Sequence, residues 1–189
     1  MTIELGGSAP RVDVRAGAAC LTLTASGRGA AVLVLDRGDT RCLAVWEPLR
    51  ADPDPGLRGR LTRSLRAGNA GDAVAECART GASVVVTEVR PGGNVHVLGW
   101  AAPSVLQVST ARPGLVPLDV PTPQGSRVRL APGDLLVLCS PGLLVQPPAC
   151  LHADLAAQCP AGGQEAWDWA RRGLVEPLTE GAVALVQAV

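Results

Sequence analysis

The tripeptide Ser140-Pro141-Gly142 is a polar break that directly follows Leu135–Cys139, an apolar segment typical of a buried strand. A strand that ends in a glycine-containing tip can present a reactive side chain at the edge of a sheet. Serine and proline are not obvious catalysts, and no histidine or asparagine is placed by the sequence to activate the neighbouring Cys139. The stretch 127–145 is therefore predicted to be a strand, a Pro-Gly-Asp turn and a buried strand, with Asp134 orienting the turn.

A second group of chemically capable residues is Cys150-x-His152 followed by Cys159, with Cys139 upstream. Zinc sites favour two close pairs of ligands, and only one close pair is present here. The interpretation as unrelated cysteines and histidine is favoured, and a zinc-stabilised structural module is kept as a hypothesis from another functional class.

Three other polar residues are single candidates. Asp52 and Asp54, in a proline-rich loop, are weak candidates for metal ligands, although an aspartate beside a proline is also ordinary turn chemistry. His96 alternates with Val95 and Val97 along an expected strand, which predicts that its ring faces solvent.

Composition excludes several classes of protein. The 189 residues carry no net charge and are 47% hydrophobic, which is typical of a folded domain rather than a disordered chain. Phenylalanine, tyrosine and lysine are absent, so valine, leucine and alanine must fill the core around four tryptophans. The sequence lacks the basic patches with interleaved aromatic residues that are typical of nucleic-acid-binding proteins. The start of the chain does not resemble a secretory signal, no run is long enough to span a membrane, and the six cysteines are scattered singly, so we expect a cytoplasmic protein.

The hydrophobic periodicity predicts strands separated by two pairs of helices. Strands are expected at 11–15, 20–24, 30–35, 41–46, 83–89, 95–100, 105–108, 127–130, 135–139 and 181–189, and helices at 57–66, 69–80, 151–158 and 164–174. We expect 83–108 to form a meander, 127–139 a hairpin, 113–125 a proline-rich connection and Gly173 a helix cap. This order predicts an α+β fold: a four-layer αββα sandwich with two antiparallel sheets packed face to face, helices outside, and one domain over residues 1–189.

The passages 81–109 (GASVVVTEVRPGGNVHVLGWAAPSVLQVS) and 127–144 (RVRLAPGDLLVLCSPGLL) carry a resemblance to a known family. The second is similar to a pattern of Gly-Asp, apolar strand, Thr-Asp-Gly and Leu, and 43–49 (LAVWEPL) stands where an apolar strand ends in Asp-Gly. In their order, the elements resemble the metal-dependent Ser/Thr phosphatase (PPM) family, in its compact SpoIIE-like branch.

The resemblance implies a site in which strand-end carboxylates hold two manganese or magnesium ions, which activate a water for attack on phosphorus. The positions that match the ligands of the family are occupied by Gly29-Ala30, by Glu47-Pro48, by Ser140-Pro141-Gly142 with proline in place of the aspartate, and by Glu180-Gly181. Apolar and imino side chains cannot replace hard anionic ligands, so the resemblance implies a degenerate site with no catalytic residue and no cofactor.

These observations predict a pseudophosphatase that serves as a regulatory protein-binding module. By resemblance, the helical region carrying Leu57, Leu61 and Leu65 is where a protein partner, a phosphorylated protein segment or a second copy would bind, although its arginines are also explained as a solvated face. The alternative is an active manganese- or magnesium-dependent phosphoprotein phosphatase with an altered site, using as ligands Glu47, Glu180 and Asp52 or Asp54. Neither nucleic acid nor a membrane is expected as a partner.

Overall fold

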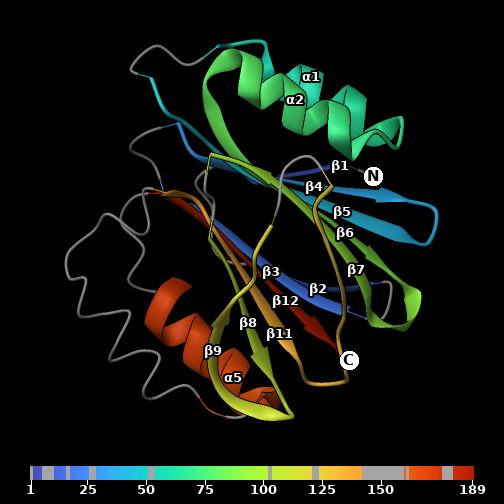
Figure 1. Cartoon of the computed structure of the whole chain (residues 1–189), viewed down its shortest axis with the longest axis vertical. Helices are drawn as coiled ribbons and strands as arrows, with labels where there is room; N and C mark the ends of the chain where they lie inside the picture. Colours follow the sequence, from blue (N-terminus) through green and yellow to red (C-terminus); the bar gives the residue numbers. More distant parts are fainter. Residues whose placement is uncertain are drawn as a thin grey trace.

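The computed structural model describes residues 2–5, 11–15, 18–25, 29–50, 54–101, 104–120, 124–141, 160, 162–175 and 181–189. Two antiparallel six-stranded sheets form the centre of the molecule (Figure 1). The first sheet has the order β1 (Thr2–Leu5), β4 (Ala31–Arg37), β5 (Thr40–Pro48), β6 (Ala82–Arg90), β7 (Asn94–Trp100) and β10 (Ser126–Arg129). The second sheet has the order β2 (Arg11–Arg15), β3 (Ala18–Ala25), β12 (Gly181–Ala188), β11 (Leu135–Cys139), β8 (Ser104–Ser109) and β9 (Arg112–Pro117).

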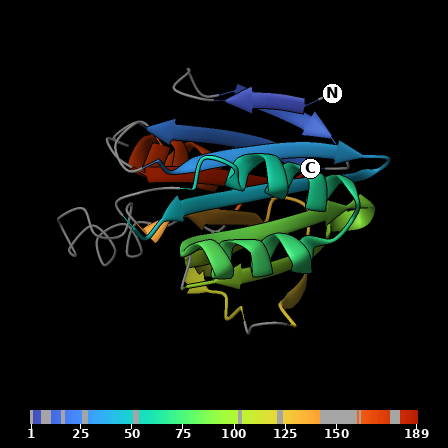
Figure 2. The same cartoon turned by 90° about the horizontal axis from the view of Figure 1, so that it is seen from above.

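Helices cover the outer faces of both sheets. The pair α1 (Leu57–Arg66) and α2 (Ala70–Thr80) lies on the first sheet, and α5 (Gly163–Ala170), which continues into a π-helical turn over Arg171–Val175, lies on the second (Figures 1 and 2). A single 3-10 turn, Pro91–Gly93, joins β6 to β7. The predicted α+β class, with two antiparallel sheets packed face to face and helices outside, is confirmed. No helix in the described ranges is both long and apolar enough to cross a membrane.

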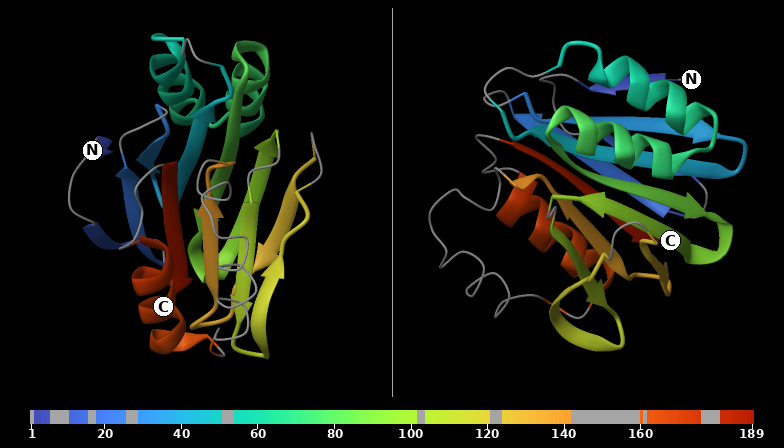
Figure 3. Two further views of the ribbon diagram at one scale, coloured as in Figure 1. Left: turned by 90° about the vertical axis from the view of Figure 1, so that its left-hand side faces the viewer. Right: turned by 45° about the horizontal axis from the view of Figure 1, so that its top comes forward.

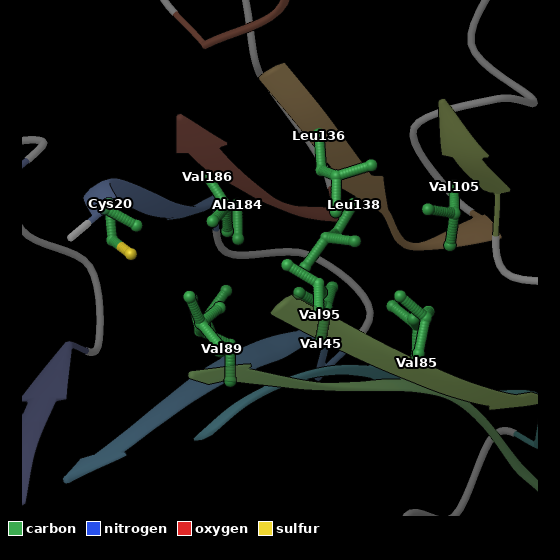
Figure 4. Close-up of a cluster of buried hydrophobic side chains, with 14 of the residues drawn as sticks. Cys20, Val45, Val85, Val89, Val95, Val105, Leu136, Leu138, Ala184 and Val186 are labelled. Carbon is green, nitrogen blue, oxygen red and sulfur yellow. The ribbon is translucent and has the colours of Figure 1, made fainter. Parts of the chain in front are cut away.

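The apolar residues separate into three layers because the central strands are covered on both faces. Leucines, valines and small residues of the two sheets meet in the inner layer, where their side chains point toward one another (Figure 4). On β5, Leu43 and Val45 enter this layer, whereas Ala44 and Trp46 face α1 and α2. Strands buried on both faces read as continuous apolar runs, which is why they are recognisable in the sequence.

The helix pair begins and ends close to the predicted positions. Leu57, Leu61 and Leu65 are buried against the first sheet. Gly81 ends α2 in the left-handed conformation at φ 70°, and its N–H donates to the carbonyl of Cys77. Asn69 precedes α2 as predicted, but its side chain donates to the carboxylate of Asp72 instead of capping a backbone N–H.

The predicted hairpin over 127–139 is wrong, because β10 and β11 belong to different sheets. β10 pairs with β7, whereas β11 lies between β8 and β12. The turn at Pro132-Gly133 therefore carries the chain from one sheet to the other. The predicted meander is wrong for the same reason: β6 and β7 form a hairpin, but β8 is in the second sheet.

Further differences concern segments whose patterns are weak. β9 pairs with β8 inside the region predicted as a connection, and β1 was not predicted. Gly173 does not cap the last helix, because the π-helical turn continues to Val175. His96 lies on the outer face of β7 as predicted, but it is half-buried there, and its Nε2 lies 3.2 Å from the carbonyl oxygen of Gln124. The helix predicted over 151–158 lies outside the described residues.

Candidate functional site

The candidate site lies at the end of the sandwich where β5 and β11 finish and β6 and β12 begin; we refer to it as the Glu47 end. Pro48 pairs with Ala82 in the first sheet, and Cys139 pairs with Val183 in the second. The left panel of Figure 3 views the molecule from this side. The strand ends therefore bring the positions singled out at Glu47 and at Ser140 to the same end of the fold.

Glu47 points into the space between the two sheets. Leu43 and Val45 precede it at intervals of two and belong to the inner layer, so the alternation of the strand places the carboxylate on the same face. Its residue is only 3% exposed. A buried carboxylate at the end of a strand is the arrangement that a metal site of the expected type requires.

Ser83 lies directly opposite Glu47 in the ladder between β5 and β6. The same alternation directs its side chain toward the inner layer, since Val85 belongs to that layer. Its hydroxyl is fully buried and has no hydrogen-bond partner among the described residues. Sequence reasoning missed Ser83, because only the strand register places it beside Glu47.

Ser140 is held by the backbone of β12. Its N–H donates to the carbonyl of Ala182 at 2.9 Å, and the N–H of Ala182 donates to its Oγ at 3.0 Å. The serine is fully buried, and its hydroxyl oxygen extends the ladder between β11 and β12 by one more contact. Pro141 follows and is half-buried. This strand end is consequently occupied by a structural hydroxyl and an imino ring.

Asp54 takes part in the N-terminal region of α1. One carboxylate oxygen accepts the N–H of Gly56 at 2.8 Å, and the other accepts from the guanidinium of Arg60. The hydrogen bond from Arg60, followed by that from Gly56, lowers the pKa of Asp54 below its usual value. Both oxygens are thus engaged in ordering the loop and the helix. Asp52 and Glu180 lie outside the described residues.

The described donor set does not fit a two-metal centre. Within the ranges given above, no three His, Cys, Asp or Glu side chains are grouped so that they could hold a metal ion. Among the described residues, the carboxylate of Glu47 lies opposite Ser83, whose hydroxyl is neutral; at the end of β11, Ser140 offers another neutral hydroxyl and Pro141 has no side-chain donor atom. Two divalent cations need several anionic oxygens, so no catalytic step can be derived from these residues.

Cys139 is the described member of the group considered for zinc. It packs in the layer beneath α5, and burial raises the pKa of its thiol to about 12. Zinc binds the thiolate, so this environment opposes coordination. The residues Cys150, His152 and Cys159 lie outside the described ranges.

The leucines proposed as part of a partner surface are not accessible. Leu57, Leu61 and Leu65 are at most 5% exposed, because the first sheet covers them. A partner at the helix pair would instead meet its arginine-bearing face, where Arg60 pairs with Asp54 and with Glu76. Binding of a partner at this helical region stays a prediction, and the arginine-bearing face is the part of the region that a partner could contact.

The comparisons with known proteins identify the fold. No protein-family model matches the chain, and no curated protein matches its sequence. The structure is similar to that of RsbX in complex with magnesium, with a TM-score of 0.64 and 10% identity over 96% of this chain and 100% of the other. It is also similar to the phosphatase domain of SpoIIE from Bacillus subtilis, with a TM-score of 0.55 and 11% identity over 94% and 92% of the two chains.

A third similar structure is PppA, a key regulatory component of the T6SS in Pseudomonas aeruginosa, with a TM-score of 0.52 and 13% identity over 93% of this chain and 98% of PppA. At such low identities, these likenesses establish the fold and leave the chemistry to the residues of the chain itself. Since they span nearly the whole of both chains, the protein has the PPM phosphatase fold, in the form found in SpoIIE-like phosphatases.

Proposed function

We propose that the protein is a pseudophosphatase of the PPM fold, in which residues 1–189 act as one domain that binds a regulatory protein partner without hydrolysing phosphate. The observation that carries the proposal is the strand end at Ser140 and Pro141. The resemblance assigns a metal-binding aspartate to Pro141, and here the hydroxyl of Ser140 accepts a backbone hydrogen bond from β12. A proline ring cannot hold a divalent cation.

The environment of Glu47 supports the same proposal. Among the described residues, the buried carboxylate of Glu47 lies opposite the neutral hydroxyl of Ser83, and one carboxylate provides too little negative charge to hold two divalent cations. RsbX, which has a similar fold, is described in complex with magnesium, so the fold itself is compatible with metal binding. The difference proposed for this chain lies in its residues.

A regulatory role is supported by the descriptions of proteins with similar structures. PppA is described as a regulatory component of a secretion system, and the structure of another chain with the fold is described under the bacterial stressosome. We infer by analogy that this chain also acts through a protein partner. The partner can be a phosphorylated protein, because loss of the metals removes hydrolysis and leaves the scaffold.

The test is hydrolysis of p-nitrophenyl phosphate by the purified chain with added manganese or magnesium. We expect no turnover above the buffer control, and no difference between wild type, Glu47→Ala and the matched control Glu165→Ala, whose carboxylate is exposed on α5. Metal-dependent turnover that is lost in Glu47→Ala and kept in Glu165→Ala would overturn the proposal and establish an active phosphatase with an altered site.

Isothermal titration with manganese gives a second readout that does not depend on the substrate. We expect no saturable binding of manganese, because the described donors at the Glu47 end are one carboxylate and neutral oxygens. Binding of two ions per chain, lost in Glu47→Ala, contradicts the proposal even if p-nitrophenyl phosphate is not a suitable substrate.

A further inference from the structure

β10 is an edge strand of the first sheet, and β6 and β7 separate it from β5, the strand that carries Glu47. It pairs on one side with β7, in a register that places Arg127 opposite His96 and Arg129 opposite Asn94. Among the described residues, no strand pairs with its other side. An edge of this kind can accept an additional strand from another chain.

The backbone pairing shows which groups of β10 are directed outward. Leu130 continues the same register, and its N–H donates to the carbonyl of Gly93 at 2.8 Å. Bonded and non-bonded pairs alternate in an antiparallel ladder, so Val128 is bonded to β7 and the pairs formed by Arg127 and Arg129 are non-bonded. The N–H and C=O groups of these two arginines therefore point away from β7, toward the free edge.

The side chains of the same two residues make the edge basic. Arg127 and Arg129 are exposed and form no ion pair within the described ranges, whereas Val128 packs against the inner layer. Together with Arg90 and His96 they line a hollow of about 380 Å³ on the outer face of β7 and β10. The whole chain has no lysine and a formal net charge of zero, so this group of arginines makes the surface beside β10 more basic than the chain as a whole.

Glu88 places a negative charge next to the basic residues that line this hollow. Glu88 is buried beneath the surface and pairs with Arg90 at 3.2 Å and with Arg37 at 3.5 Å; the Nδ1 of His96 lies 3.9 Å from it. Glu88 therefore offsets part of the charge of its neighbours. The guanidinium groups of Arg127 and Arg129 remain available for an anionic ligand.

The hollow continues into an apolar one. Gly93, Arg129, Leu130, Pro132 and Val189 are among the residues that line a second hollow of about 470 Å³, which shares Arg129 with the first. The surface beside β10 thus offers backbone hydrogen bonds along the strand, positive charge on its outer face and an apolar recess at one end.

We propose that the β10 edge binds an extended acidic peptide segment of a partner protein by strand addition, independently of whether the Glu47 end hydrolyses phosphate. The added strand would pair with the outward N–H and C=O groups of Arg127 and Arg129. Its side chains alternate between the two faces, so carboxylates at every second position would meet the arginines, and the intervening positions would be apolar.

The test uses fluorescence polarisation with a labelled, end-blocked heptapeptide, Glu-Val-Glu-Val-Glu-Val-Glu. We expect saturable binding that weakens as salt is raised, and that is at least tenfold weaker for the peptide with glutamine in place of glutamate. The double variant Arg127→Gln/Arg129→Gln should lose binding by a similar factor. The matched control Arg63→Gln/Arg66→Gln removes the same charge from the exposed face of α1 and should bind like wild type.

Hydrogen exchange separates strand addition from loose attraction of charge. On addition of the peptide to wild-type protein, the amide protons of Arg127 and Arg129 should become protected, while that of Val128 is protected throughout by the ladder. Equal binding of the glutamine peptide, equal loss in the α1 control, or binding without protection of these two amides overturns the proposal. The exchange measurement needs no variant, so it decides the matter even if the double variant folds poorly.

Discussion

Removal of the Asp134 carboxylate should destabilise the fold more than the loss of any exposed charge. Asp134 is 3% exposed at the crossover from β10 to β11. One oxygen accepts the N–H and the hydroxyl of Thr110, at 2.6 and 3.0 Å, and the other accepts the N–H of Ala131 at 3.0 Å. The side chain thus ties the crossover to the turn that joins β8 and β9.

The magnitude follows from these three hydrogen bonds. A hydrogen bond to a charged group contributes about 1.5–3 kcal/mol, but the buried carboxylate also pays for desolvation, and water can reach the exposed Thr110 after its removal. We therefore expect Asp134→Ala to lower the free energy of unfolding by about 3 kcal/mol. For a chain of this length, that corresponds to a fall in Tm of about 6–12 °C.

The assay is urea unfolding followed by tryptophan fluorescence, with Asp134→Asn and Asp119→Ala alongside. Asparagine keeps the shape of the side chain, but its amide N–H₂ would replace one of the accepting oxygens and face a backbone N–H donor, so we expect about 2 kcal/mol of destabilisation. Asp119 is exposed, and its removal should change stability by less than about 0.5 kcal/mol. A loss below about 1 kcal/mol for Asp134→Ala would refute the reasoning, because the crossover would then be held by its backbone alone.

Two further predictions concern the core and the β10 edge. Burial raises the pKa of the thiols of Cys77 and Cys139 to about 12, so these thiols stay protonated in the folded protein, whereas in the unfolded chain they ionise near the ordinary thiol pKa of 9.0. The free energy of unfolding should therefore fall between about pH 9 and 12, by up to about 1.4 kcal/mol per pH unit for each thiol. A flat pH profile of urea midpoints would contradict this. Gly93→Ala should lower the free energy of unfolding in urea by more than about 2 kcal/mol, because the φ of Gly93 is +73° and a Cβ would lie 2.2 Å from the carbonyl oxygen of Leu130. The control Gly71→Ala, on the open face of α2, should instead stabilise the protein by about 0.5–1 kcal/mol. Equal effects of the two substitutions would disprove this explanation.

Most helices and strands could be predicted because their local patterns are strong. The leucines at 57, 61 and 65 repeat with the helical period, and the central strands are apolar on both faces. β9 could not be predicted, because its segment contains Pro113 and Pro117, and proline is tolerated in a strand only where no ladder hydrogen bond is needed, as at this edge. The composition of this segment does not determine whether it forms a strand, and the pairing with β8 makes it one.

The pairing of strands also depended on tertiary contacts. A short turn containing Pro132 and Gly133 can close a hairpin or lead to another sheet, and the local sequence is the same in both cases. The inner layer decides between them: Val128 and Leu136 both face it, but from opposite sheets. A sequence pattern records that a residue is buried and does not record the partner that buries it.

For the candidate site, the sequence by itself determined which residue types are present: a glutamate at position 47, a serine at 140 and a proline at 141. Those identities limit the chemistry whatever the fold, because donor atoms are a property of the side chain. Only the tertiary structure decided that Glu47 faces the inner layer opposite Ser83, that Ser140 bonds to β12, and that the arginines of β10 lie along a free edge. These facts depend on strand register and sheet order, which long-range packing sets.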